Sequence, residues 1–185
     1  TAPTVTGGAP LVISGVTVPA GGSALLLYEA QTNGYAPPAA GSSITNTAQI
    51  TGEGVGTPIT AQATVTAGET LRLTISKCMS PTSVVENGTV TYTFYLQNSG
   101  NTATADSDFV VVTDTFNPVL SGLTVTLNGT PLASGTGYTY NAATGEFATR
   151  TGVISVPAAT MTQDSETGQW RVTPGVAKLV VTGTV

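Results

Sequence analysis

Charged side chains are scarce in this 185-residue chain, and histidine is absent altogether. Lysine, arginine, aspartate and glutamate together make up 8% of the residues. Without histidine, neither a Ser-His-Asp or Cys-His catalytic arrangement nor a histidine-rich zinc site can be assembled. Cys78 is the only cysteine, which excludes an intrachain disulfide and any metal site built from several cysteines. We therefore expect a protein that is not an enzyme and that binds no cofactor.

Basic residues are especially few: 5 stand against 10 acidic residues, for a formal net charge of −5. They are dispersed, so no cluster can neutralise a run of phosphates or hold an anionic membrane surface. No apolar run is long enough to span a bilayer. We expect neither a nucleic-acid partner nor a direct membrane span. Because the chain begins at Thr1 without an initiator methionine or a signal peptide, we also expect a mature fragment or a piece cut from a longer chain.

What the chain does contain is β-branched residues, turn residues and a clear alternation of side chains. Val90, Tyr92, Phe94 and Leu96 share one face of an extended segment, and the residues between them share the other. The same alternation recurs at residues 71–75, 123–127 and 177–181. Short half-buried strands with turns between them are typical of antiparallel sandwiches. The sequence therefore predicts an all-β fold of immunoglobulin-like antiparallel β-sandwich repeats.

Turn residues divide the chain into the expected strands. Asn128-Gly129 predicts a tight hairpin turn, because both residues adopt positive φ at little cost. We expect strands near residues 11–18, 23–30, 43–52, 58–66, 69–77, 88–98, 109–115, 123–128, 137–141, 145–149, 152–156, 169–173 and 176–184.

A weak internal repeat suggests how these strands are organised. LVISGVTVPAGGSALLLY at residues 11–28 is similar to GVISVPA and PGVAKLVVT within residues 152–182. The first copy is followed by the strand ITNTAQI at residues 44–50, which has no counterpart after the second copy. We therefore expect residues 1–66 to be the C-terminal part of one repeat. Residues 67–185 would be most of a second repeat that lacks its closing strand.

Two stretches also resemble a known family. They are LTISKCMSPTSVVENGTVTYTFYLQNSGNTA at residues 73–103, followed by VVVTDTF at residues 110–116, and ITNTAQITG at residues 44–52. They resemble the bacterial surface repeat known as the DUF-eleven domain, a domain of unknown function. The resemblance implies immunoglobulin-like sandwiches strung in tandem on secreted or cell-wall proteins, often of clostridia-like bacteria, without an enzymatic role. The truncated first and second repeats depart from that pattern.

Fimbrial and adhesin domains of related architecture crosslink themselves through a Lys–Asn amide, with a carboxylic acid between the two residues. Burial in an apolar core favours the neutral amine and the neutral acid that this reaction needs. Here Lys77, Asn46, Asp114 and Glu29 are the candidates, because each lies in phase with the apolar face of its strand. Lys77 and Asn46 belong to different repeats, so a bond within one repeat would need partners outside this chain.

Simpler interpretations of the same residues are favoured over a crosslink. Lys77 lies close to Pro81, where its strand ends, and its ammonium group can reach water over the apolar stem. Asn46 can bond neighbouring backbone, and Asp114 can cap the turn that precedes Pro118.

Two further groups of residues are candidate binding sites. Asp106 and Asp108 could supply oxygen ligands to calcium, although the complete calcium-loop pattern is missing and a solvated loop is the favoured interpretation. Trp170, Tyr138 and Tyr140 could form an aromatic surface for a sugar, or they could fill the core of a sandwich.

We therefore expect a structural repeat of a secreted or cell-surface protein, acting as a spacer or as a building block of filaments or adhesins. The expected location is extracellular, at the cell wall or at the cell or spore surface. Because a missing strand leaves an open sheet edge, we expect strand pairing with neighbouring repeats or with copies of the chain. The alternative is an adhesin domain that recognises a glycan or a host protein through its end loops. An enzyme using Asp106, Asp108 and Glu146 is a third option, but their spacing suggests no catalytic pair.

Overall fold

The computed structural model describes residues 2–185, which divide into two compact units after residue 33. Its elements are strands, apart from one 3₁₀ turn, η1, at Asp106–Asp108. Every pair of strands among the described residues is antiparallel. The prediction of an all-β antiparallel fold is confirmed. The boundary predicted after residue 66 was inferred from the internal repeat and not from the compactness of the units. It stays a prediction.

The unit of residues 1–33 contains little regular structure. Strand β1 (Thr4–Thr6) pairs with β2 (Val12–Ser14), which is shorter than the strand predicted at residues 11–18. The strand predicted at residues 23–30 is not formed, although the segment Leu25-Leu26-Leu27-Tyr28 is strongly apolar. Leu25 is 83% exposed and Leu27 is 86% exposed. The prediction was wrong because a strand needs a hydrogen-bonding partner, and this segment pairs with no strand among the described residues.

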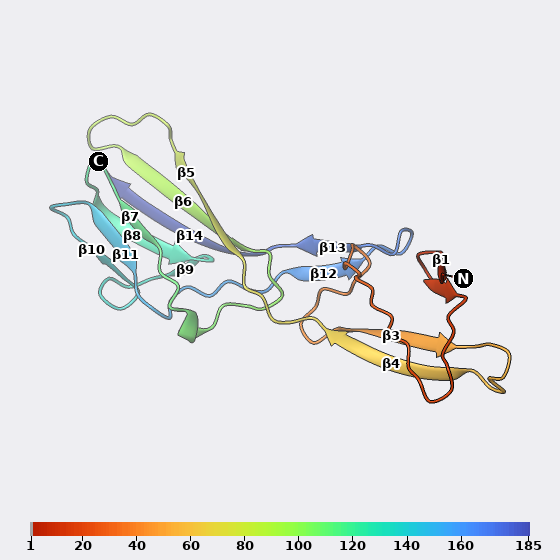
Figure 1. Ribbon diagram of the computed structural model, residues 1–185. Helices are drawn as coiled ribbons and strands as arrows, with labels where there is room; N and C mark the ends of the chain where they lie inside the picture. Colours follow the sequence, from red (N-terminus) through yellow and green to blue (C-terminus); the bar gives the residue numbers. More distant parts are fainter. Residues whose placement is uncertain (1) are drawn as a thin grey trace. The chain divides into compact units, whose positions relative to one another are not determined.

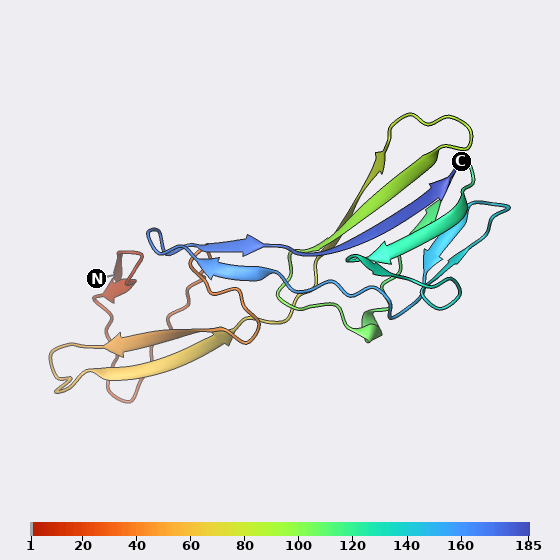
Figure 2. The ribbon, with the colours of Figure 1, turned by 180° about the vertical axis from the view of Figure 1, so that it is seen from behind.

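A five-stranded sheet is the centre of the second unit (Figures 1 and 2). Its order is β5-β6-β14-β8-β9. The bounds are Leu73–Ser80 for β5, Thr89–Asn98 for β6, Gly175–Thr184 for β14, Ser121–Leu127 for β8 and Thr130–Pro131 for β9. Asn128 and Gly129 both have positive φ in the turn between β8 and β9, so the predicted hairpin turn is confirmed.

A three-stranded sheet packs against one face of the first. Its order is β10-β11-β7, with bounds of Tyr138–Tyr140 for β10, Glu146–Thr149 for β11 and Thr113–Thr115 for β7. The core lies between the two layers, because side chains of both sheets are fully buried there. Its members are Val90, Phe94, Leu96, Val112, Phe116, Leu120, Val125, Tyr138, Phe147, Ile154, Val156, Ala177, Leu179 and Val181. The second unit thus contains a two-layer sandwich.

Several segments of the second unit differ from the predicted strands. Strand β5 begins at Leu73 instead of residue 69, and β7 covers only Thr113–Thr115 of the predicted residues 109–115. Residues 152–156 form no strand, because Val156 bonds to the backbone and the hydroxyl of Thr104 instead of a sheet partner. An additional strand, β12 (Thr160–Gln163), pairs with β13 (Trp170–Thr173). Only β13 was expected from the sequence.

One further hairpin completes the second unit. Strand β3 (Ser43–Ile50) pairs with β4 (Ile59–Thr66) over their full lengths. These two strands form a separate sheet. Strands were expected at residues 43–52 and 58–66.

Candidate functional site

The hairpin of β3 and β4 has two chemically different faces. Directly opposed residues share a face, and the opposed pairs Ile44 with Val65, Ala48 with Ala61, and Ile50 with Ile59 are all apolar. Asn46, opposite Ala63, is the one polar member of this face. Every residue of both strands is exposed, Val65 by 68%. A sheet face that is apolar except for Asn46 is therefore exposed to water.

The other face of the hairpin is a polar ladder. The hydroxyl groups of Thr45 and Thr64 are hydrogen bonded at 3.1 Å, and the Gln62 amide donates to Thr47 Oγ1 at 3.1 Å. These cross-strand bonds hold the register of the hairpin. An isolated two-stranded hairpin is only marginally stable in water, and burying one face against another layer makes it stable. The apolar face is the one suited to that burial.

A second apolar face is exposed on β5, at the edge of the five-stranded sheet. Leu73, Ile75, Lys77 and Met79 lie opposite Asn98, Leu96, Phe94 and Tyr92 of β6, so they project to the same side of the sheet as the core. Ile75 is nevertheless 58% exposed, and Leu73 and Met79 are also exposed. The three-stranded sheet therefore does not cover the core-side face of β5.

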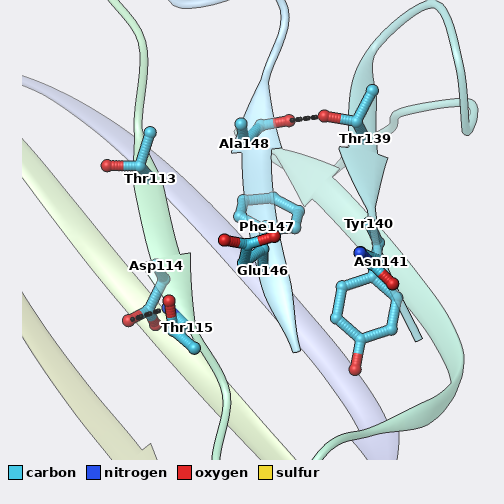
Figure 3. A pocket seen from close by; sticks show the side chains of 9 residues that line it. All are labelled: Thr113, Asp114, Thr115, Thr139, Tyr140, Asn141, Glu146, Phe147 and Ala148. Carbon is cyan, nitrogen blue, oxygen red and sulfur yellow. Dashed lines mark hydrogen bonds between the residues drawn. The ribbon is translucent and has the colours of Figure 1, made fainter. Parts of the chain in front are cut away.

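Strand β7 is the edge of the three-stranded sheet that lies beside this uncovered face. It pairs with β11 on one side and with no strand among residues 2–185 on the other. In Figure 3 the carboxylate of Asp114 lies on the side of β7 away from β11. The backbone groups on this edge are a template for an additional strand.

Lys77 and Asp114 meet at the junction of these two features. The Lys77 ammonium group donates a hydrogen bond to Asp114 Oδ2 and forms an ion pair with it. The Thr115 amide donates to Asp114 Oδ1 at 2.9 Å, which fixes the carboxylate. The Lys77 side chain is 38% exposed and that of Asp114 is 18% exposed. The pair therefore lies at the boundary between core and solvent.

Three aromatic rings surround the ammonium group of Lys77. Nζ lies 4.6 Å from the ring centroid of Tyr92, 5.4 Å from that of Phe94 and 5.5 Å from that of Phe116. These rings attract the cation through their quadrupoles and exclude water from one side of it. Lys77 therefore lies on the core side of β5, with Asp114 as its partner.

The other two crosslink candidates lie on other segments of the chain. Asn46 lies in the middle of the apolar face of the β3–β4 hairpin. Glu29 lies in the unit of residues 1–33 and is exposed. Lys77 and Asp114 are thus in contact, whereas Asn46 lies on a different element, and the crosslink stays a prediction.

One hydrogen-bonded cluster was not foreseen from the sequence. The segment Asn98–Asn101 holds the linker between β4 and β5. The Asn101 side chain accepts from the Thr70 amide at 2.7 Å and donates to the carbonyls of Pro38 and Gly68, each at 2.9 Å. A Cβ at Gly100 would lie 2.2 Å from the Thr70 carbonyl oxygen, so only glycine fits there. The sequence signal for this cluster was Asn101, a second asparagine that directly follows Gly100.

The calcium candidates Asp106 and Asp108 lie in the 3₁₀ turn η1. Asp108 accepts from the Ala105 amide at 2.7 Å within η1. Among residues 2–185, no three acidic or cysteine side chains gather in a way that could hold a metal ion.

The three aromatic candidates do not share one exposed surface. Tyr138 is buried and stacks on Phe147 at 5.6 Å, and the Tyr140 hydroxyl bonds to the backbone of Leu120. Trp170 lies on β13, in another sheet.

Strands β7, β10 and β11 also line an open hollow, drawn in Figure 3, whose margin includes Asp114, Glu146 and Tyr140. Glu146 Oε2 there accepts a hydrogen bond from Thr144 Oγ1 at 2.9 Å.

Comparison of the chain with protein-family models, with curated proteins and with solved structures finds no match. Within the described residues, no helix has the length and apolar character that crossing a membrane requires.

Proposed function

We propose that this chain is a non-catalytic structural repeat that joins to copies of itself by strand addition. The β3–β4 hairpin of one copy adds to the open edge of β7 in the next copy and covers β5. The observation that carries this proposal is the pair of uncovered apolar faces, one on the hairpin and one on β5. The resemblance to DUF-eleven repeats suggests a secreted or cell-surface bacterial protein.

The order of strands supports this arrangement. An immunoglobulin-like sandwich has one sheet in the order A-B-E-D and a second sheet in which strand F lies between C and G. Strands β5, β6, β14 and β8 follow the first order, and β7 takes the place of C. The open edge of β7 is then the place of F, and the uncovered face of β5 is the place opposite G.

The internal repeat supports assigning the hairpin to the places of F and G. PAGGSALLLY at residues 19–28 corresponds to TPGVAKLVV at residues 173–181, which includes β14 in the place of E. The strands that follow residues 19–28 are β3 and β4. They therefore have the sequence position of F and G, and they suit a sandwich that has A to E.

The register of addition follows from the alternation of side chains. An antiparallel pairing that places Asn46 opposite Asp114 also places Ile44 opposite Phe116 and Ala48 opposite Val112. Phe116 and Val112 are buried core residues, so each hairpin residue would face the core. Burying each of the large side chains Ile44, Ile50, Ile59 and Val65 contributes about 1.5–3 kcal/mol.

The acceptor is a second copy rather than the sandwich of the same copy. The linker from β4 to β5 is held by the bonds of Asn101 to Pro38, Gly68 and Thr70, and the Arg72 amide donates to Asn98 Oδ1. Folding the hairpin back onto β7 would break these bonds. Addition to another copy keeps them.

Light scattering over a range of concentrations tests this function. We expect the wild-type chain to form dimers and larger species as its concentration rises. Ala48→Glu should weaken association at least about a hundredfold, because it buries an unpaired carboxylate at the new interface. Gln49→Glu, on the polar face of the same strand, is the matched control and should associate like the wild type. A wild-type chain that stays monomeric at every concentration would overturn the proposal.

A further inference from the structure

The proposed assembly would bring a carboxamide to a lysine–carboxylate pair. We propose that Lys77 of one copy and Asn46 of the next become joined by an amide bond, with Asp114 as the acid–base group. This inference rests on the proposed function, because strand addition is what carries Asn46 to the pair. It goes beyond that function by making the contact between copies covalent.

The placement of the three groups carries the inference. With Asn46 opposite Asp114, the two Cβ atoms are about 4.5–5.5 Å apart, as in any directly opposed pair. Asp114 is already hydrogen bonded to Lys77 Nζ. The carboxamide of Asn46 would therefore enter a site where the nucleophile and its acid–base partner are in contact. No other residue of the hairpin's apolar face has a side-chain carbonyl group.

The surroundings favour the reactive forms of these groups. On one side the rings of Tyr92, Phe94 and Phe116 exclude water. The added hairpin would cover the other side with Ala48, Ala61 and Ala63, which are neighbours of Asn46 on its face. Enclosing an ion pair in apolar surroundings favours proton transfer from the ammonium to the carboxylate, because two buried charges are costly.

The reaction balances without any further reagent. A proton moves from Lys77 Nζ to Asp114, and the free electron pair of Nζ attacks Cγ of Asn46 while the acid holds Oδ1. The new Nζ–Cγ bond forms and the Cγ–Nδ2 bond breaks. Asp114 relays a proton from the attacking nitrogen to Nδ2, which leaves as ammonia. The extra proton that began on lysine stays on Asp114 or leaves with ammonia as ammonium.

The chain offers one nucleophile for this reaction. Its other lysine, Lys178, projects from the opposite face of the five-stranded sheet, with Nζ 5.8 Å from the centroid of Tyr95. Each copy therefore has one nucleophilic lysine and one asparagine that accepts the attack. The bonds would thus join the copies into an unbranched polymer. Cys78 is the only cysteine, and disulfides alone would stop at dimers.

The amide bond is tested by comparing native and denatured samples of the same assembled wild-type chain. We expect a ladder beyond the dimer in a reducing denaturing gel, and a mass deficit of one ammonia for each bond. Digestion should yield a peptide in which Asn46 and Lys77 are joined. Assemblies that dissolve completely into unmodified monomers in denaturant would overturn the amide bond and leave strand addition standing. Monomers under native conditions would overturn both.

Two variants separate a bond between copies from a bond within one copy. Lys77→Arg keeps the cation beside Asp114 but removes the nucleophile, and Asn46→Ala removes the acceptor carbonyl. Neither should form a ladder alone, whereas Lys178→Arg should form it as the wild type does. A mixture of the first two should yield one covalent dimer and nothing larger, since Asn46 is supplied by one copy and Lys77 by the other. A mixture without this dimer would contradict the proposal.

The role of Asp114 has its own test. Asp114→Asn preserves the shape of the side chain and its bond from the Thr115 amide, but it cannot relay a proton. General acid–base catalysis contributes about 10²–10⁴-fold, so the ladder should form at least about a hundredfold more slowly. A ladder that forms at the wild-type rate would show that Asp114 does not take part.

Discussion

At the scale of single residues, polar side chains fix the backbone at points where the sheets do not. Asn98 is completely buried and bonds to the backbone of Arg72, Gly100, Thr102 and Pro157. Tyr140 connects two segments in a similar way: its hydroxyl accepts from the Leu120 amide at 2.7 Å and donates to the Leu120 carbonyl at 2.9 Å. Such bonds specify the loops between layers, where alternation of apolar residues gives no guidance.

Replacing Tyr140 with phenylalanine should lower the free energy of unfolding by about 1–3 kcal/mol, because the backbone groups of Leu120 lose their partner. Tyr95→Phe is the matched control, since Tyr95 is exposed on the outer face of β6 and should change stability little. Chemical denaturation of the two variants measures the difference. Equal stabilities would show that the Leu120 groups are satisfied by water.

At the scale of strands, alternation predicted which side chains face the core but not which strands face each other. Val90, Phe94 and Leu96 are buried as expected, and Lys77 and Asp114 both point inward. Their contact depends on the pairing of β5 with β6 and on the layer that contains β7, and no local pattern encodes either. Leu25 and Leu27 show the converse: an apolar run predicts a strand, but only hydrogen-bonding neighbours make one.

The stability of the β12–β13 hairpin should decrease in acid because of Asp164 at its turn. The amide of Thr167 is the main cause of the lowered pKa of Asp164, followed by the Thr167 hydroxyl and the Glu166 amide, and Arg171 adds a smaller effect. A lowered pKa means that the carboxylate stabilises the folded hairpin above the ordinary aspartate range. That contribution is lost as pH falls through the lowered pKa.

Hydrogen exchange measures this effect, since the Gly168 amide donates to the Asp164 carbonyl within the turn. We expect protection of Gly168 to decrease at acidic pH in the wild type. Asp164→Asn keeps an oxygen acceptor but does not titrate, so its protection should be independent of pH over that range. The same pH dependence in both proteins would assign it to another group.

At the scale of the whole molecule, the donor hairpin and the acceptor edge are different surfaces, so the proposed contact is head to tail. Such a contact extends into an open fibre unless its rotation closes a ring. Each fibre would end in an uncovered hairpin on one side and an open β7 edge on the other.

This polarity predicts how growth can be stopped. An Ala48→Glu chain keeps its β7 edge but has lost a usable hairpin, so it can join a fibre only by accepting the last hairpin. Added in small proportion to the wild type, it should shorten the fibres seen by electron microscopy. Gln49→Glu should leave their length unchanged. Fibres of unchanged length in both mixtures would contradict head-to-tail addition.

The positions of Asn46 and Lys77 on elements that follow each other in sequence determine how a linked string of copies would bear tension. Pulling force would enter each copy at one of these residues and leave at the other, so it would travel only through residues 46–77. The rest of the sandwich would lie outside the path of the force and would not be stretched. The linked copies would therefore bear tension without unfolding of their cores.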